Sequence, residues 1–197
     1  IAEQDRLARL IADGDKVWAH VRYGGSAPMA GVDIYRLDAD SRIVEHWILR
    51  QPLRGDPAHH AAHFESAHPE PCVHRLDPAW LKARVHSMLT RMWRHAAAEL
   101  VPEYYDPSYI QHNPDMPGGY QRILEIVRHD IRLYIEKTGA PFPIEIHQLG
   151  AEGDLVFVHI SIFMAGINRN DGDRSTNVDI FRVNPEGRMC EHWDVLQ

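Results

Sequence analysis

A long internal repeat constrains this chain more than any other feature of the sequence. Residues 32–51 read VDIYRLDADSRIVEHWILRQ and residues 178–197 read VDIFRVNPEGRMCEHWDVLQ, so nine of 20 positions are identical at a constant offset of 146. A second pair of segments, 14–20 and 153–159, matches at an offset of 139. The seven extra residues fall between the matching blocks, in a polar stretch of the kind where insertions are tolerated best. This pattern indicates an internal duplication.

Each copy has the pattern of an antiparallel meander. In the second copy we expect strands at 144–149, 155–165, 175–183 and 188–196. The last two are joined by the sequence Asn-Pro-Glu-Gly, which favours a turn because proline fixes φ and glycine accepts a positive φ. The first copy repeats this plan and has its last turn at Asp38–Ser41.

Helices are expected before the second meander only. Asp77 and Pro78 form a favourable helix start, and apolar residues then recur at helical spacing. A short helix is expected near 96–101. A further helix follows Gly118, and Gly139 is a plausible C-terminal cap for it.

The chain is therefore predicted to hold one complete α+β domain at 75–197 and the sheet half of a first unit at 1–52. The segment 53–74, rich in proline, glycine and histidine, is interpreted as a linker. Ile1 is no translation start, and the residues after it form neither a signal nor a transit peptide, so we expect the natural protein to have further N-terminal residues.

Composition excludes several classes of partner. The chain has 21 Lys and Arg against 28 Asp and Glu, a formal net charge of −7, whereas phosphate binding needs a basic face. No stretch approaches the roughly 18 apolar residues of a membrane span. Cys72 and Cys190 form neither a disulfide framework nor a zinc motif. We expect a cytoplasmic protein that binds neither nucleic acid nor membrane.

Four segments of the second unit carry a resemblance to a known family. They are YIQHNP at 109–114, GDLVFVH at 153–159, VDIFR at 178–182 and EHWDVLQ at 191–197. In this order and spacing they resemble the SnoaL-like polyketide cyclases, whose cone-shaped fold is shared with nuclear transport factor 2, ketosteroid isomerase and scytalone dehydratase. The resemblance implies an α+β fold in which N-terminal helices close a pocket over a strongly curved antiparallel sheet, which often dimerises through its outer face.

The resemblance also implies an activity. The characterised cyclases perform a cofactor-free intramolecular aldol condensation, with an aspartate near the end of the last strand as general acid and base. Asp194 matches that aspartate. A carboxylate in an apolar pocket is desolvated, which raises its pKa towards the operating pH and makes it a competent base and acid. A small carbonyl or polyketide-like ligand is the expected partner, and no cofactor is expected.

Strand alternation groups the candidate residues independently of the resemblance. If Asp194 faces the pocket, so do His192 and Cys190, while Glu191 and Trp193 face the other side. The neighbouring strand presents three residues on one face: Asn177, Asp179 and Phe181.

We therefore expect Asp194 and His192 to be catalytic, with His192 as a hydrogen-bond donor to the developing oxyanion. By resemblance, six residues are candidates for ligand binding: Tyr109, His112, Asn113, Asn177, Asp179 and Phe181.

The first copy departs from this site. It keeps an acid and a histidine at matching positions, Asp33 and His46, but Ile48 stands where the second copy has Asp194. Isoleucine cannot transfer a proton, so the first unit is expected to lack the chemistry. Its sheet could pack on the second sheet as a dimer mate would, which makes a pseudo-dimer within one chain, and a homodimer is also open.

Other functions stay open. His59 and His63 have i, i+4 spacing, but no HExxH motif accompanies them, so no metal site is expected. The polar insert 168–174 resembles a calcium loop only superficially. Isomerase, dehydratase or hydrolase chemistry fits the same cone, although Arg182 has the wrong parity relative to Asp179 for an aspartate–arginine–aspartate set. A non-catalytic binding or assembly module is the alternative class, because fold alone does not choose a function.

Overall fold

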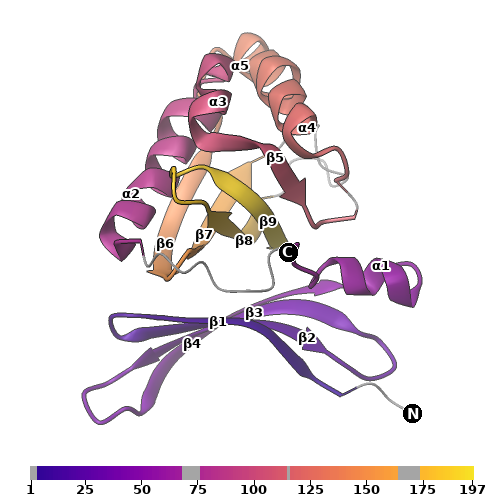
Figure 1. Ribbon diagram of the computed structural model, residues 1–197, viewed down its shortest axis with the longest axis vertical. Helices are drawn as coiled ribbons and strands as arrows, with labels where there is room; N and C mark the ends of the chain where they lie inside the picture. Colours follow the sequence, from indigo (N-terminus) through magenta and orange to yellow (C-terminus); the bar gives the residue numbers. More distant parts are fainter. Residues whose placement is uncertain (1–3, 68–75, 115, 164–173) are drawn as a thin grey trace.

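Two stacked β-sheets, one of them capped by helices, make up the protein in the computed structural model (Figure 1), which describes residues 4–67, 76–114, 116–163 and 174–197. Sheet A has the order β1-β2-β3-β4 and consists of Arg6–Asp13, Lys16–Tyr23, Met29–Leu37 and Ile43–Pro52. Sheet B has the order β5-β9-β8-β7-β6 and consists, in chain order from β5 to β9, of Tyr105–Gln111, Ile144–Glu152, Leu155–Phe163, Arg174–Val183 and Met189–Leu196. Neighbouring strands are antiparallel except β5, which runs parallel to β9.

The expected meanders are present in both halves, and their registers agree. Asp33 lies opposite Ile48 in the pairing of β3 with β4. Asp179 lies opposite Asp194 in the pairing of β8 with β9. Residues that match in the sequence repeat therefore occupy matching places in the two sheets. The polar insert 168–174 lies outside the described residues apart from its last position, and Cys72 lies outside them as well.

The helices of the second half begin and end largely as predicted. The Asp77 carboxylate accepts a hydrogen bond from the Trp80 amide at 2.8 Å and caps the first helix. Gly139 ends the last helix in the left-handed conformation, with φ of 68°, which glycine adopts without strain. The helical segments are α2 (Pro78–Ser87), η1 (Met88–Trp93), η2 (Ala98–Leu100), α3 (Val101–Tyr104), α4 (Gly119–Glu125), η3 (Ile126–Ile131) and α5 (Arg132–Thr138).

Helices and sheet B together enclose one hydrophobic core, and a second core fills the space between the two sheets (Figure 1). In the second core Trp18 of sheet A contacts Phe157 of sheet B, with ring centroids 6.0 Å apart. Hydrogen bonds join the sheets at their margins, among them one from the Leu196 amide to Gln51 Oε1 at 3.0 Å. The outer face of sheet B is thus covered by a sheet of the same chain.

The predicted linker is more structured than expected. It contains the helix α1 (Pro57–Ala62), whose first turn is capped by the Asp56 carboxylate at 2.9 Å from the His59 amide. His63, which follows this helix, is only 3% exposed. Residues 63–67 then run against the inter-sheet core, so this part of the segment packs on the fold instead of spanning freely between two units.

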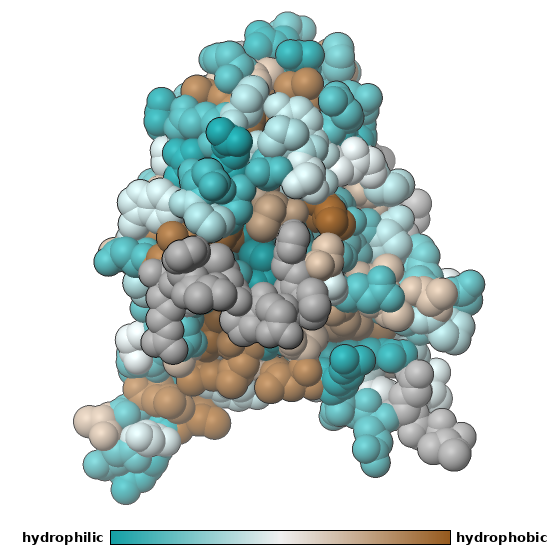
Figure 2. Space-filling view, in the orientation of Figure 1, coloured by the Kyte–Doolittle hydropathy of each residue, from teal (hydrophilic) through white to brown (hydrophobic). Residues whose placement is uncertain are grey.

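The face of sheet A that points away from sheet B carries no helix in the described part of the chain. Several large apolar side chains of this sheet are exposed: Leu7, Leu10, Ile43, Val44 and Ile48. Figure 2 shows a band of hydrophobic surface along sheet A, below the largely hydrophilic surface of the helices. Within the described residues, no helix has the length and apolar character that crossing a membrane requires.

Candidate functional site

A cavity of about 340 Å³ lies between the helices and the concave face of sheet B. Its wall is mainly apolar and is formed by Leu89, Trp93, Ile123, Ile126, Ile131, Phe142, Ile144, Ile160, Ile162 and Leu196. Arg122 and Asp130, both partly exposed, also line the cavity and form a loose ion pair at 3.5 Å. An apolar hollow with a few polar groups at one end is the usual form of a small-molecule site.

The polar end of this cavity holds three ionisable side chains. Asp179, His192 and Asp194 are all buried, and each has one N or O atom within 4.8 Å of the other two. His192 Nε2 lies 3.5 Å from Asp179 Oδ1, and Asp194 Oδ1 accepts a hydrogen bond from Asn113 Nδ2 at 2.7 Å. The strand alternation expected from the sequence thus brings both acids and the histidine to one place.

The His192 ring is held by its neighbours. It stacks on Phe181, with centroids 4.6 Å apart and an interplanar angle of 11°. Gln111 Nε2 lies 2.8 Å from His192 Nδ1, while Gln111 Oε1 accepts a hydrogen bond from the Asn113 amide at 3.0 Å. Because the amide oxygen of Gln111 is already occupied, its NH₂ group faces the imidazole, and Nδ1 must accept. The neutral imidazole therefore carries its proton on Nε2, the atom that faces Asp179.

Two opposing effects act on the pKa of His192. Burial disfavours the charged imidazolium, whereas the contact with Asp179 and the negative charges of Asp179 and Asp194 favour it, and the balance raises the pKa above its ordinary value of 6.5. The Gln111 NH₂ group opposes a second proton on Nδ1. The histidine is thus poised to hold or release a proton beside two carboxylates.

Three buried polar atoms of cavity-lining residues have no hydrogen-bond partner within the described part of the chain: Tyr109 Oη, Asn177 Oδ1 and His192 Nε2. Burial, with the nearby Tyr105 and the two aspartates, raises the pKa of Tyr109 well above 10, so its hydroxyl stays a donor. Unsatisfied buried polar groups cost free energy, and their grouping at one end of a cavity points to a polar ligand.

Asp179, His192 and Asp194 also form a potential set of metal ligands. Two carboxylates and one imidazole are suitable ligands for a divalent cation. A histidine that binds metal through Nε2 donates its Nδ1 proton to an acceptor, as a rule. Here Gln111 presents a donor to Nδ1 instead. The surroundings of His192 therefore fit a hydrogen-bonding imidazole better than a metal ligand.

Two sequence-based expectations about orientation are wrong. His112 does not point into the cavity: its ring stacks on Trp193 at 4.8 Å, and its Nε2 lies 2.7 Å from Glu191 Oε2, on the outer face of sheet B. Cys190 is buried, but it does not line the cavity, and burial raises the pKa of its thiol to about 12. The remaining predicted residues lie in or next to the cavity.

Gln111 is the residue that the sequence analysis missed. β5 continues to Gln111, so Tyr109 and Gln111 share a face and His112 takes the opposite one. The alternation of side chains that grouped the residues of the last two strands also applies here. It would have identified Gln111 if residues 109–111 had been predicted to be the end of a strand.

The first sheet holds a related but open arrangement. His46 Nε2 lies 2.7 Å from Asp33 Oδ1, and the Tyr23 hydroxyl hydrogen-bonds to the other Asp33 oxygen. Tyr35 stacks on His46 at 4.5 Å. No helix of the described chain covers these residues, so they do not form a closed cavity.

Another depression, of about 550 Å³, lies between the sheets at one margin. Its polar side chains largely satisfy one another: His147 Nε2 lies 2.8 Å from Ser161 Oγ, which lies 3.2 Å from Thr176 Oγ1, and Arg36 pairs with Glu45 at 2.9 Å. Among the described residues, this depression has no group of unpartnered buried polar atoms like the one in the cavity.

Comparison with protein families decides the classification. The model of the SnoaL-like domain matches residues 85–192, which is more than half of the chain and includes β5 to β8 and the start of β9. The chain belongs to the SnoaL-like domain family. The α+β cone expected for the second half is thereby confirmed, and a sheet-rich half unit precedes it.

Several solved structures are similar to this SnoaL-like chain at low sequence identity. TsrD from Streptomyces laurentii is 19% identical, with a TM-score of 0.49, covering 62% of this chain and 91% of its own. An epoxide hydrolase of the LEH-like type from M. tuberculosis is 16% identical, with a TM-score of 0.45, covering 61% and 84%. A steroid delta-isomerase from Pseudomonas aeruginosa is 17% identical, with a TM-score of 0.42, covering 60% and 78%. No curated protein sequence matches this chain.

Proposed function

We propose that this SnoaL-like protein catalyses proton transfer on a small carbonyl compound, as in an aldol ring closure, by general acid and base catalysis. One observation carries the proposal. Two buried aspartates and a histidine meet at the polar end of a mainly apolar cavity, beside polar atoms without partners. Such a set offers both a base and hydrogen-bond donors in a water-poor place, where electrostatic effects are strong.

Asp194 is proposed as the base. Its carboxylate removes a proton from the carbon next to a carbonyl, and the electron pair moves to the carbonyl oxygen to give an enolate. The Nε2 proton of His192 and the hydroxyl of Tyr109 stabilise that oxygen. The enolate carbon then attacks a second carbonyl of the same molecule, and protonated Asp194 returns its proton to the new alkoxide. Asn113, which donates to Asp194 at 2.7 Å, holds the carboxylate in place.

The cavity also limits the substrate. A volume of about 340 Å³ fits a molecule of one or two rings, and the apolar wall favours a hydrophobic body with its carbonyl groups at one end. Asn177 and Asp179 on β8 are proposed to orient those carbonyl groups or hydroxyl groups close to them. Isomerisation of a double bond next to a carbonyl uses the same first step and fits the same residues.

The test is exchange of carbon-bound hydrogen. The protein is incubated in D₂O with a panel of aryl ketones and 1,3-diketones, and deuterium incorporation at the α-carbon is followed by NMR. We expect wild type to accelerate exchange and D194N to reduce it by at least about a hundredfold. D33N, which changes the aspartate of sheet A that matches Asp179, is the control and should keep the wild-type rate. Equal rates for wild type, D194N and the buffer blank would contradict the proposal.

A second candidate is binding without catalysis, which the same unpartnered atoms favour. Mass spectrometry of the purified protein under native conditions separates catalysis from binding alone. A binding module is favoured if the protein releases a bound small molecule in unchanged form and is inactive towards all carbonyl probes.

The two halves are proposed to be products of a duplication, with the half unit at 1–52 and the complete domain at 75–197. The matching cross-strand pairs and the core shared by both sheets support this. In this view sheet A takes the place of a dimer mate. Homodimerisation and a cytoplasmic location also remain proposals.

A further inference from the structure

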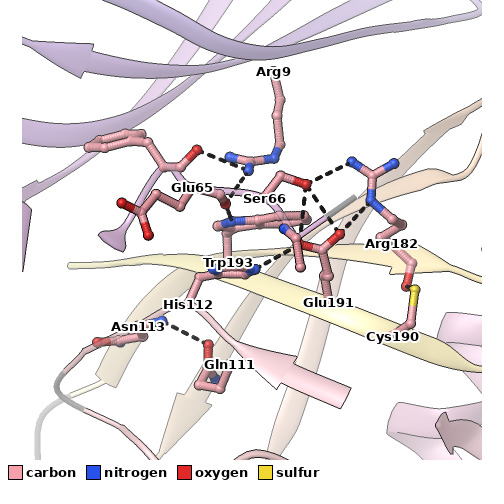
Figure 3. Close-up of polar contacts among 12 residues, drawn as sticks. Arg9, Glu65, Ser66, Gln111, His112, Asn113, Arg182, Cys190, Glu191 and Trp193 are labelled. Carbon is pink, nitrogen blue, oxygen red and sulfur yellow. Dashed lines mark hydrogen bonds and ion pairs between the residues drawn. The ribbon is translucent and has the colours of Figure 1, made fainter. Parts of the chain in front are cut away.

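Glu191 lies at the centre of a buried polar network on the outer face of sheet B, opposite the cavity (Figure 3). Its side chain is 0% exposed and accepts hydrogen bonds from His112 Nε2 at 2.7 Å, Arg182 Nε at 2.9 Å and the Ala67 amide at 2.9 Å. Ser66 Oγ lies 3.2 Å from both carboxylate oxygens. A buried charge needs this kind of satisfaction to persist. We call these five residues the Glu191 network.

The first half of the chain contacts residues that lie next to this network. The Arg9 guanidinium of β1 lies 3.4 Å from the centroid of the Trp193 ring and donates to the carbonyl oxygen of Glu65 at 2.9 Å. Trp193 Nε1 donates to the same carbonyl oxygen at 2.7 Å. Figure 3 shows Arg9 reaching from sheet A towards Trp193, with residues 65 and 66 between the sheets. Residues 65–67 are thereby fixed against β9.

His112 connects the network to the cavity across one strand. Its ring is held by Trp193 and Glu191 on the outer face, and its backbone amide donates to the His192 carbonyl at 2.9 Å. The residues on either side of His112 turn the other way: Gln111 contacts His192 and Asn113 donates to Asp194. Of these three successive residues, His112 therefore lies on the outer face of sheet B, whereas Gln111 and Asn113 lie on the cavity face.

We propose that His112 is a positioning residue. Through His112, the Glu191 network and the neighbouring contacts from the first half of the chain determine which nitrogen of His192 carries the proton and how Asp194 is oriented. This inference rests on the proposed function. Its physical basis is that β5 and β9 pair in register over only two residues at this end, Ile110 and Gln111, after a register shift between Tyr105 and Ile110, so few backbone contacts hold the end of β5. The bond from His112 to Glu191 fixes that end, and with it the two amide side chains.

The test uses H112F in the full chain. Phenylalanine keeps the stacking on Trp193 and removes only the Nε2 donor. With the end of β5 released, Gln111 no longer holds Nδ1 of His192 as an acceptor. In ¹⁵N NMR of histidine-labelled protein, at a pH where His192 is neutral, the ratio of Nδ1–H to Nε2–H tautomer should rise about fivefold, the ratio that corresponds to one ordinary hydrogen bond. Deuterium exchange on the active ketone should fall roughly tenfold or more.

The matched control is H46F in sheet A. His46 also stacks on an aromatic ring and contacts a buried carboxylate, Asp33 at 2.7 Å, but lies far from the cavity in the fold. We expect H46F to leave the His192 tautomer unchanged. H112Q, which keeps an N–H donor for Glu191, should restore most of the wild-type tautomer ratio.

Each outcome is decisive. An unchanged His192 tautomer in folded H112F overturns the proposal, as does an equal change in H46F. If H112F does not fold, R9M, which removes the first-half contact without touching β5, takes its place; a smaller rise is expected there, and none would overturn the proposal. Because the tautomer is measured without a substrate, a protein inactive towards ketones but with an altered tautomer in H112F would refute the proposed reaction and keep the positioning role.

Discussion

Asp179 and Asp194 lie directly opposite each other in the register of β8 and β9, and His192 lies beside both. Cross-strand neighbours of equal charge repel each other, so this pair is unfavourable for stability unless a proton or a donor is shared nearby. Such pairs are typical of functional sites, where ionisation has a task.

D194N should lose exchange activity and keep its thermal stability. The substitution removes one of two neighbouring negative charges while keeping the size of the side chain, so we expect the melting temperature to stay within a few degrees of wild type or to rise. Thermal unfolding followed by circular dichroism measures this. A large loss of stability would mean that Asp194 is a structural residue of sheet B.

I48D should not give sheet A exchange activity. The change rebuilds the acid pair in sheet A, opposite Asp33, but no described helix covers that face, so the carboxylate stays hydrated. Ile48 is 39% exposed, and we expect a stability cost below about 1 kcal/mol. The exchange assay is run with I48D in the D194N background. If the double variant regained activity, the rebuilt acid pair of sheet A would work without a cavity, and the prediction would be wrong.

Y109F should reduce activity without destabilising the protein. The Tyr109 hydroxyl is buried and has no partner within the described residues, so its removal should be neutral or stabilising by up to about 1 kcal/mol. Y105F is the matched control: its hydroxyl accepts a hydrogen bond from Trp93 Nε1 at 3.2 Å, and its loss should cost about 1 kcal/mol. Urea unfolding separates the two variants, and the reverse order of stability would contradict this assignment.

Glu191 should make the fold sensitive to acid. Burial alone would raise the pKa of this carboxyl, but hydrogen bonds from His112 and Ala67 and the charge of Arg182 lower it from 4.5 to about 2. A carboxyl with a lowered folded-state pKa stabilises the fold above its unfolded pKa, and the contribution disappears as the pH falls from 4.5 towards 2.

From this lowering of the pKa we expect Glu191 to contribute about 3 kcal/mol to the free energy of unfolding at neutral pH. The free energy of unfolding is measured for wild type and E191Q at several pH values. Other carboxyl groups titrate in both proteins and cancel in the difference. We expect this difference to be constant above about pH 5 and to shrink below it. A difference that does not change with pH would contradict the assigned charge.

W18A should weaken the association of the two sheets. Trp18 is fully buried against Phe157 in the core between them, and its truncation should cost about 3–5 kcal/mol in the free energy of unfolding. W80A is the control, because Trp80 on α2 is 44% exposed and should cost less than about 1 kcal/mol. If both variants lose the same stability, sheet packing is not what holds the halves together.

The alternation of side chains along strands is a local property, and for that reason it could be predicted from the sequence. A period of two residues places Asn177, Asp179 and Phe181 on one face of β8. The same period places His192 and Asp194 on one face of β9, and all five residues line the cavity. The helix start at Asp77 follows equally from short-range chemistry, since a capping side chain reaches only the next turn.

The orientation of His112 could not be obtained in this way from its position after the helices. It depends on where β5 ends and on which strand it joins, and β9 lies about 80 residues further along the chain. The same holds for the segment 63–67, whose contacts with Trp193 and Glu191 arise only after both sheets have stacked. Long-range pairing therefore decided the outer face of the site.

The sequence by itself determined the repeat, the meanders and the residues that share a strand face, because these follow from local periodicity and turn chemistry. The tertiary structure alone decided that Gln111 contacts His192, that Asn113 contacts Asp194, that His112 lies on the opposite face, and that sheet A covers sheet B. Those relations join residues far apart in the chain, and they exist only once the burial of apolar surface has brought the two sheets and the helices together.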